Sequence, residues 1–410
     1  MPELFQVVTV DVANQRLGEH LAPLQRVEHV ALLDALDRTT AQDLHSPAPL
    51  PAFARSTMDG FAVRAADTYG ASEGLPAYLT LIGEAPMGRP PDLVVGSGEA
   101  VRVHTGGMLP AGSDAVVMVE NTQALDARMI EVVRPVAIGE NVIPIGEDVA
   151  PGALLFPRGH RLRPQDIGGL AGVGLASVPV AARPRVAILA TGDEVVPAEQ
   201  EPQPGQIRDI NTYTVATIIK RAGGVPLPAG IAPDDIDLLR RMARAALAEA
   251  DMLLISAGSS VSTRDMTAQV IGELGQPGVL VHGVSIHPGK PTILAVADGQ
   301  PVFGLPGNPV STLVACDLFV APALRQLLGS APLPPWQMVQ ARLTHNVASI
   351  PGREDFVPVR LETRADGLWA EPIFGKSNLI YTVAHADGML HVPLDRAGLY
   401  ANDPVAIRLF

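Results

Sequence analysis

Hydrophobic and polar positions alternate most regularly between residues 181 and 330. Short apolar runs bounded by glycine, proline or polar residues predict buried strands, and longer stretches with apolar residues three and four apart predict amphipathic helices. Strands and helices that alternate at this spacing predict an α/β sheet with helices on both faces. The expected strands are 185–190, 225–230, 251–258, 279–286, 291–297 and 301–305, and the expected helices are 210–224, 234–250, 264–275 and 309–328.

Outside this region, turns and short strand-like runs dominate. Residues 51–145 show no long helical pattern and predict a small β-rich domain. Residues 330–410 begin with a proline-rich boundary, SAPLPPW, and predict a second small β domain. One helical pattern is expected within residues 26–43, and one helix begins near Pro164.

The composition indicates a packed globular protein and excludes several functions. Apolar residues make up 47% of the positions and charged residues 18%, as in a packed globular protein. The length of 410 residues predicts roughly two to four folded domains. A formal net charge of −13 excludes broad nucleic-acid binding, which needs a basic surface. The single cysteine, Cys316, excludes an internal disulfide and a CxxC metal site. Because the N-terminus lacks a signal-peptide pattern and no apolar run reaches the ~18 residues that span a bilayer, a soluble cytoplasmic protein without membrane contact is expected.

Three turns follow the expected strands of the α/β region: ATGDE (190–194), SAGSS (256–260) and GLPGN (304–308). All three are small, polar or rich in glycine. Ligands of such sheets bind beyond the carboxyl ends of the strands. Three such turns at one end of one sheet favour a ligand site there.

The third turn has the features of an anion site at a helix N-terminus. Asn308 is a good N-cap, and Pro309 suits the first helical position, where no N–H is needed. Gly304 and Gly307 would let the backbone approach a ligand. The unpaired N–H groups of a helix N-terminus attract anions. For this turn alone, a capped helix without a ligand is the alternative.

Acidic residues beside these turns predict a divalent cation. Asp193 and Glu194 directly follow a strand, and Asp265 is expected at the start of its helix. A carboxylate beside a phosphate would repel it unless a cation such as Mg²⁺ lies between them. Lys290 lies in a turn between two expected strands. Helix capping for the acids and simple solvent exposure for the lysine are the alternatives for each residue alone.

Taken together, these segments resemble the molybdopterin molybdenumtransferases, the MoeA family, which corresponds to the E domain of gephyrin. The resemblance covers nearly the whole chain in the family's order. It rests on STMDGFAVRAADT (56–68), VHTGGMLPAGSDAVVMVE (103–120), GEDVAPGALLFPRGHRLRPQDIGGLAGVG (146–174), VAILATGDEVV (186–196), DINTYTVATIIKRAGG (209–224), HPGKPTILA (287–295), FGLPGNPVSTLVA (303–315), PGREDF (351–356) and FGKSN (374–378).

The resemblance implies a multidomain α/β protein. A three-layer MogA-like α/β domain would bind molybdopterin, beside a β-rich second domain, a split linking domain and a C-terminal β-barrel-like domain. It also implies an elongated homodimer whose active cleft lies between the α/β domain and the partner's second domain, and a molybdopterin adenylyltransferase as a further candidate partner. The implied boundaries are 15–50 and 146–180 for the linking domain, 51–145 for the second domain, 1–14 and 181–329 for the α/β domain, and 330–410 for the C-terminal domain.

The implied reaction is the Mg²⁺-dependent insertion of molybdate into adenylylated molybdopterin, with release of AMP. A pterin-binding or scaffolding paralogue without catalysis and a tungstate-inserting homologue are the alternatives; a generic nucleotide-phosphate hydrolase is disfavoured because every other family segment is present. The resemblance assigns catalytic roles to Asp59, Thr105, Asp148, Glu194, Asp234 and Asp265, with Glu194 and Asp265 as Mg²⁺ ligands; substrate binding to Thr191, Gly192, Asp193, Ser256, Gly258, Lys290, Pro306, Gly307, Asn308 and Pro309; and oxyanion binding to Lys290, Arg353, Ser377 and His287.

Two segments depart from the family's pattern. Ala257 and Ser262 stand where the family usually has glycine, and added Cβ atoms restrict close ligand approach. His287 stands where the family usually has a lysine. Because histidine is largely uncharged at neutral pH, the oxyanion site is expected to hold one cation fewer.

Overall fold

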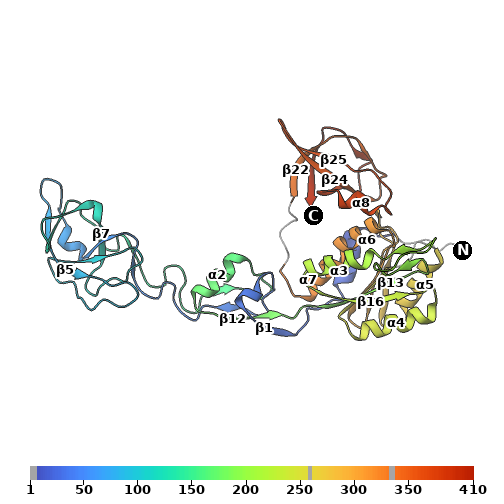
Figure 1. Cartoon of the computed structure of the whole chain (residues 1–410), viewed down its shortest axis with the longest axis horizontal. Helices are drawn as coiled ribbons and strands as arrows, with labels where there is room; N and C mark the ends of the chain where they lie inside the picture. The colour runs from blue at the N-terminus through green and yellow to red at the C-terminus, as the bar shows by residue number, and fades with distance from the viewer. Residues whose placement is uncertain (1–6, 257–260, 332–337) are drawn as a thin grey trace.

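The chain is elongated in its computed structural model, which describes residues 7–256, 261–331 and 338–410. A β-rich unit around β5 and β7 lies at one end, a smaller unit around β1, β12 and α2 lies in the middle, and the α/β sheet and the C-terminal strands lie at the other end (Figure 1). The predicted fold class, a multidomain α/β protein, is confirmed. The domain boundaries stay a prediction.

The α/β unit is built on a six-stranded sheet of order β16-β13-β17-β21-β20-β18. The first four strands run parallel, whereas β20 and β18 pair antiparallel. The predicted strands of this sheet are present with ends that shift by a few residues, except that the strand expected at 279–286 is divided into two elements. Their bounds are β13 (Arg185–Thr191), β16 (Val225–Ala232), β17 (Met252–Ser256), β18 (Pro277–His282), β20 (Ile293–Ala297) and β21 (Gln300–Leu305).

Helices cover both faces of this sheet, as predicted. On β13, Val186 and Ile188 pack in one cluster with α1, α3, α6 and α7, whereas Ala187 and Leu189 pack in a second cluster with α4 and α5. This alternation follows from the two-residue period of a strand. Burial of each large apolar side chain stabilises the sheet by about 1.5–3 kcal/mol. The helices are α1 (Val10–Gly18), α3 (Asn211–Arg221), α4 (Ile236–Ala248), α5 (Val261–Gly272), α6 (Pro309–Ala315) and α7 (Ala321–Leu327).

A π-helical turn, η4 (Cys316–Val320), joins α6 to α7 in one continuous helix. By length and apolar composition, Pro309–Leu327 could cross a membrane, but 72% of its most apolar 18-residue stretch is buried inside the protein. Its apolar composition is therefore explained by core packing in the α/β unit. The irregularity of this helix lies at the π turn, ahead of Pro322.

Two predicted elements differ from the structure. The helix expected within residues 26–43 is wrong: β1 (Val27–Ala31) and a short 3-10 turn, η1 (Leu32–Ala35), occupy this segment. The reason is tertiary pairing, because β1 pairs antiparallel with β12 (Ser177–Ala181) and this long-range ladder overrides local helix propensity.

The strand expected at 279–286 is also wrong as a single element. The chain turns at Gly283, which has a φ of +103°, so β18 ends before a separate strand, β19 (Ile286–His287). Strand β19 leaves the α/β sheet and pairs with β24 of the C-terminal unit. This break brings residues of the two units together.

The two remaining units are mostly β structure. The β-rich unit is a six-stranded sheet of order β7-β4-β6-β5-β9-β8, and in the C-terminal unit β24, β25, β22, β28 and β26 close into a five-stranded barrel. The predicted β domains are therefore present. Their strands are β4 (Gly60–Val63), β5 (Ala77–Glu84), β6 (Glu99–Val103), β7 (Ala115–Met118), β8 (Thr122–Ala124), β9 (Met129–Val132), β22 (Met338–Leu343), β24 (Glu354–Arg364), β25 (Gly367–Pro372), β26 (Gly388–Val392) and β28 (Pro404–Leu409).

The middle unit joins two segments that are far apart in sequence. Besides the β1–β12 pair, β2 (Leu44–His45) pairs with β11 (Leu154–Phe156). Helix α2 (Pro164–Gly172) begins at the predicted proline. Short elements complete the chain: η2 (Ala65–Thr68), η3 (Val119–Asn121), β3 (Arg55–Ser56), β10 (Val142–Ile143), β14 (Val195–Val196), β15 (Ile207–Arg208), β23 (Val347–Ala348), β27 (Gly398–Leu399) and α8 (Ile380–Ala384).

A buried carboxylate, Asp166, caps α2 and predicts an acid-sensitive stability. Burial alone would raise the pKa of Asp166, but hydrogen bonds from Arg163 and His160 outweigh it and lower the pKa to about 2. An acid whose pKa is lower in the folded than in the unfolded protein stabilises the fold at pH values above its unfolded-state pKa. This stabilisation is lost as the pH falls through the folded-state pKa. We expect Asp166→Asn to lower the free energy of unfolding by about 2 kcal/mol at neutral pH. Urea unfolding should show that the loss shrinks from about pH 4 to about pH 2; an equal loss at both pH values would contradict this account.

Candidate functional site

Four parallel strands end side by side at one edge of the α/β sheet. Thr191 lies opposite Ala232, and Ser256 lies opposite both Ala190 and Leu305. The turns that follow β13, β16, β17 and β21 therefore begin at this shared edge. Residues 257–260 of the second turn, including Ala257 and Gly258, lie outside the described residues.

Asn211, the first residue of α3, connects two of these turns. Its Nδ2 donates to Ser256 Oγ at 3.1 Å and to the Gly307 carbonyl at 2.8 Å. Because a carbonyl only accepts hydrogen bonds, this contact determines which way the amide points. Asn211 was not among the predicted site residues. It could have been found from its position at the start of a helix, two residues after Asp209, whose carboxylate accepts from Thr212 N at 3.0 Å.

The GLPGNP turn is joined to the C-terminal unit. Asn308 is at the N-cap and Pro309 at the first helical position, as predicted, but the Asn308 side chain makes no cap hydrogen bond. Its Nδ2 instead donates to Ser377 Oγ at 2.8 Å, and Val310 N donates to the Ser377 carbonyl at 3.1 Å. One amide of the helix N-terminus is thus already used by the protein. The structure brings Asn308 and Ser377 together.

Gly304 has a packing role that differs from the predicted one. It lies inside β21, where an added Cβ would come within 3.1 Å of Ile293 and 3.2 Å of Ile271. The prediction that Gly304 allows a ligand to approach is therefore wrong, since the missing side chain makes room for neighbouring core residues.

The acidic residues after β13 are held by the first turn. Gly192 has a φ of +132°, and a Cβ there would lie 2.5 Å from Glu194 Oε2, so glycine leaves room for that carboxylate. Asp193 Oδ1 accepts from Asp234 N at 3.0 Å, which links the turns after β13 and β16.

Asp265 lies in the second turn of α5, not at its start as predicted, because the helix begins earlier. Capping by Asp265 is therefore excluded.

A second polar cluster lies where the α/β unit meets the barrel. The pairing of β19 with β24 places His287 opposite Asp355. Asp355 Oδ1 lies 3.2 Å from His287 Nδ1 and 3.0 Å from Arg353 Nε. Lys290 follows in the turn between β19 and β20, where its carbonyl accepts from Val284 N at 2.9 Å. His287 and Arg353 are therefore brought together through Asp355, which our sequence analysis did not single out.

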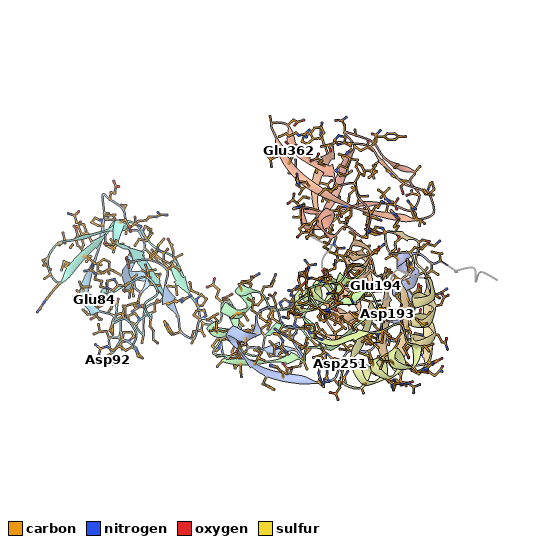
Figure 2. All side chains as sticks on the ribbon, turned by 45° about the vertical axis from the view of Figure 1, so that its right-hand side comes forward. Glu84, Asp92, Asp193, Glu194, Asp251 and Glu362 are labelled. Atoms are coloured by element: carbon orange, nitrogen blue, oxygen red, sulfur yellow. The ribbon has the colours of Figure 1, made fainter. Side chains whose placement is uncertain are left out.

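A third cluster lies in the β-rich unit. Asp59 Oδ1 accepts from Thr105 N at 2.8 Å and from Thr105 Oγ1 at 3.2 Å, and the backbone hydrogen bond is the main cause of a lowered pKa of Asp59. His104 Nε2 lies 2.8 Å from Glu84, and this hydrogen bond lowers the pKa of the Glu84 carboxyl. Figure 2 shows Glu84 at the opposite end of the chain from Glu194. Within one chain, Asp59 and Thr105 are thus separated from the sheet-edge residues.

Asp148 lies in the connection between β10 and β11, where its N–H donates to the Leu50 carbonyl at 3.0 Å. It is exposed and belongs neither to the sheet edge nor to the cluster around Asp59. The structure therefore distributes the predicted site residues over four places: the sheet edge, the barrel junction, the cluster around Asp59 and the connection that holds Asp148.

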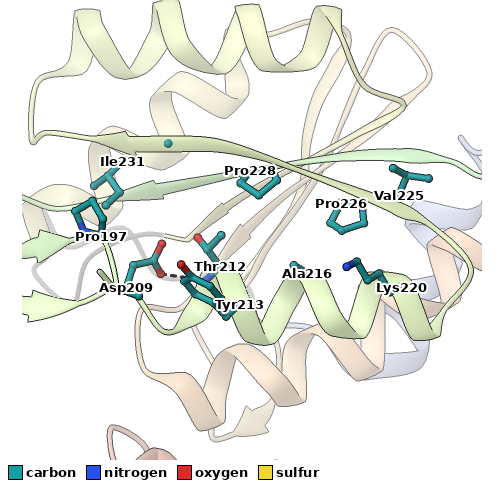
Figure 3. Close-up of a pocket in the computed structure, with 12 residues that line it drawn as sticks. Pro197, Asp209, Thr212, Tyr213, Ala216, Lys220, Val225, Pro226, Pro228 and Ile231 are labelled. Atoms are coloured by element: carbon teal, nitrogen blue, oxygen red, sulfur yellow. Dashed lines mark hydrogen bonds between the residues drawn. The ribbon is translucent and has the colours of Figure 1, made fainter. Parts of the chain in front are cut away.

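A groove of about 510 Å³ lies between α3 and the edge strand β16 (Figure 3). Pro226 and Pro228 form one wall, and Tyr213 and Lys220 form the other. Prolines in β16 fit an edge strand, whose outer side needs no ladder hydrogen bonds. None of the predicted site residues lines this groove. We therefore do not assign the substrate site to this groove.

Comparison with known proteins matches almost the entire chain. Residues 8–174 match the MoeA N-terminal region (domain I and II), residues 187–326 match the family described as a probable molybdopterin binding domain, and residues 340–410 match the MoeA C-terminal region (domain IV).

Full-length relatives agree with these matches. The chain is 33% identical to the molybdopterin molybdenumtransferase of Bacillus subtilis over 98% of this chain and 94% of that protein, and 30% identical to that of Staphylococcus aureus over 98% and 95%. It resembles the crystal structure of a MoeA protein from Pyrococcus horikoshii with a TM-score of 0.86 and 31% identity over 99% of this chain and 100% of that one. The chain therefore belongs to the MoeA family, the molybdopterin molybdenumtransferases of molybdenum-cofactor biosynthesis.

Proposed function

We propose that this chain inserts molybdate into adenylylated molybdopterin, with Mg²⁺ assisting and AMP leaving. The observation that carries this proposal is the bond between Asn308 and Ser377, which joins the strand-end turns of the α/β sheet to the barrel unit that carries Arg353. A nucleotide-activated pterin and an oxyanion both carry several negative charges. One site that combines backbone donors, hydroxyls and cations can bind both.

In this proposal, the sheet-edge cluster and the cluster at the barrel junction bind different substrates. The sheet-edge residues bind the pterin and its phosphates, and the cations at the barrel junction bind the oxyanion. Arginine is suited to this role because its planar guanidinium can hold two oxygens of one oxyanion. The proposed pterin and phosphate contacts are Thr191, Gly192, Asp193, Ser256, Gly258, Pro306, Gly307, Asn308 and Pro309, and the proposed oxyanion contacts are Lys290, Arg353, Ser377 and His287.

The acids of the sheet edge fit Mg²⁺ binding with substrate phosphates. No group of three metal-ligating side chains occurs among the residues that the structure describes, but Mg²⁺ typically takes only one or two protein carboxylates together with phosphate oxygens and water. Glu194 and Asp265 would hold the ion, and Asp234 would complete the acidic surroundings. The ion would offset the charge that develops when the phosphoanhydride bond breaks.

A direct assay tests this function. Purified protein is mixed with adenylylated molybdopterin, Mg²⁺ and either molybdate or tungstate, and AMP is measured. Release of AMP that requires molybdate supports the proposal. Release that requires tungstate alone identifies a tungstate-inserting homologue, and pterin binding without AMP release identifies a non-catalytic paralogue; either result overturns the proposal. A cytoplasmic location and supply of the substrate by a molybdopterin adenylyltransferase are part of the same proposal.

We propose further that a homodimer completes the site, with Asp59, Thr105 and Asp148 coming from a second copy. The distance between the β-rich unit and the sheet edge within one chain supports this arrangement (Figures 1 and 2). Mixing inactive Asp59→Asn and Glu194→Gln chains should then restore about a quarter of the wild-type AMP release, because half of the randomly paired dimers hold one intact site of two. The mixture is measured after dissociation and reassociation. A mixture as inactive as its parts would contradict a shared site.

A further inference from the structure

A buried carboxylate lies among the side chains assigned above to the oxyanion. Asp355 is 2% exposed. Its Oδ1 lies 3.2 Å from His287 Nδ1 and 3.0 Å from Arg353 Nε. Its Oδ2 accepts from the Ser349 hydroxyl and from Arg353 Nη2, the latter at 3.3 Å. One carboxylate thus contacts side chains from two units of the protein.

The backbone around Asp355 holds the same two units together. Parallel pairing of β19 and β24 sets His287 opposite Asp355, and Glu354 N donates to the Ser285 carbonyl at 2.8 Å. Lys290 follows His287 after three residues in a turn closed by Thr292 N and Oγ1, which both donate to the Gly289 carbonyl. Asp355 therefore lies between the turn of the α/β unit that carries Lys290 and Arg353 of the barrel unit.

The charge of Asp355 is unfavourable for binding an anion. A buried carboxylate beside Arg353 and His287 removes one unit of positive charge from a site that must attract a doubly charged oxyanion. Arg353 Nε and Asp355 Oδ1 are both buried and, within the described residues, neither has an aligned hydrogen bond despite their 3.0 Å separation. The pair is therefore held by charge, with the Ser349 hydroxyl and Arg353 Nη2 supplying the directed bonds.

We propose that Asp355 is a positioning residue of the oxyanion site: it orients Arg353 and His287 toward one point between the α/β unit and the barrel. This inference rests on the proposed oxyanion site. Side chains that contact a ligand keep their geometry only when neighbouring groups fix their rotamers. If the proposal is right, orienting Arg353 and His287 strengthens molybdate binding by more than the negative charge of Asp355 weakens it. Molybdate affinity measures which effect is larger.

The test is calorimetric binding of sodium molybdate to the full chain and to Asp355→Asn. The variant keeps the side-chain volume and adds one net positive charge to the site. If Asp355 positions Arg353 and His287, molybdate affinity falls by roughly tenfold, and in the AMP assay KM for molybdate rises while kcat changes little. If Asp355 acts only through its charge, affinity rises, and the proposal is overturned.

Two further variants control for folding and charge. Glu354→Gln makes the same charge change on the neighbouring residue, whose carboxylate lies 2.7 Å from His391, and should leave molybdate affinity unchanged. Asp355→Glu keeps the charge but displaces the carboxylate, so weaker binding supports positioning and unchanged binding refutes it, even if Asp355→Asn fails to fold. If the unchanged chain does not bind molybdate, the proposed oxyanion site itself fails, and the role of Asp355 fails with it.

Discussion

Replacing Glu194 with glutamine is expected to lower molybdate-dependent AMP release by about a hundredfold or more, or roughly 3 kcal/mol in the activation free energy. The reason is that the amide keeps the shape of the side chain but loses the charge that would hold Mg²⁺ against the substrate phosphate. The measurement is single-turnover AMP release at saturating Mg²⁺. Pterin binding should change much less than the rate, because Glu194 is proposed to act on developing charge.

Glu199→Gln is the matched control for this prediction. Glu199 lies five residues further along the same segment, and its carboxylate accepts from the Tyr213 hydroxyl at 2.8 Å. The same charge change at this exposed position should leave AMP release unchanged. Equal losses from both variants would mean that general surface charge, rather than a cation held by Glu194, controls the reaction.

Replacing Asp317 with asparagine is expected to destabilise the protein by about 3 kcal/mol. Asp317 lies in the π turn η4, and its carboxylate is 2.8 Å from Arg408 of the barrel and 3.6 Å from Arg221 of α3. Burial raises the pKa of Asp317 and lowers that of Arg408, so each charge depends on the other. Removing Asp317 leaves the guanidinium of Arg408, whose side chain is only 15% exposed, without this compensation. This should favour separation of the barrel from the α/β unit.

Urea unfolding followed by circular dichroism measures this loss. Glu362→Gln provides the control, because Glu362 pairs with Arg364 on the same barrel but is 55% exposed, and an exposed pair contributes only about 0–1 kcal/mol. A loss below about 1 kcal/mol for Asp317→Asn would show that the α/β unit and the barrel are held by apolar contacts instead.

The α/β sheet could be predicted from the sequence because its signals are local and strong. Short apolar runs such as 185–190 become strands buried on both faces, and the helix over 234–250 has an apolar stripe that one face of the sheet covers. The turns of this unit could be predicted from the positions of glycine and proline in the sequence. Even Asn308 was placed at the helix start, because the Asn-Pro pattern belongs to that position.

Features that depend on distant residues could not be predicted in this way. The segment 26–43 has a helical pattern, yet its pairing with β12 makes β1 a strand. The 279–286 run is broken because β19 joins a different unit. Asn211, His104 and Asp355 are single polar residues whose partners come from remote segments, so their roles appear only when the chain is folded.

The central claim is that one site, between the sheet edge and the barrel, holds the activated pterin and the oxyanion together. A crystal soaked with molybdate, measured at the molybdenum absorption edge, tests it most directly. We expect an anomalous peak in hydrogen-bonding contact with Arg353, Ser377 and Lys290. A peak bound elsewhere on the molecule, with these three side chains free of the ion, would contradict the account.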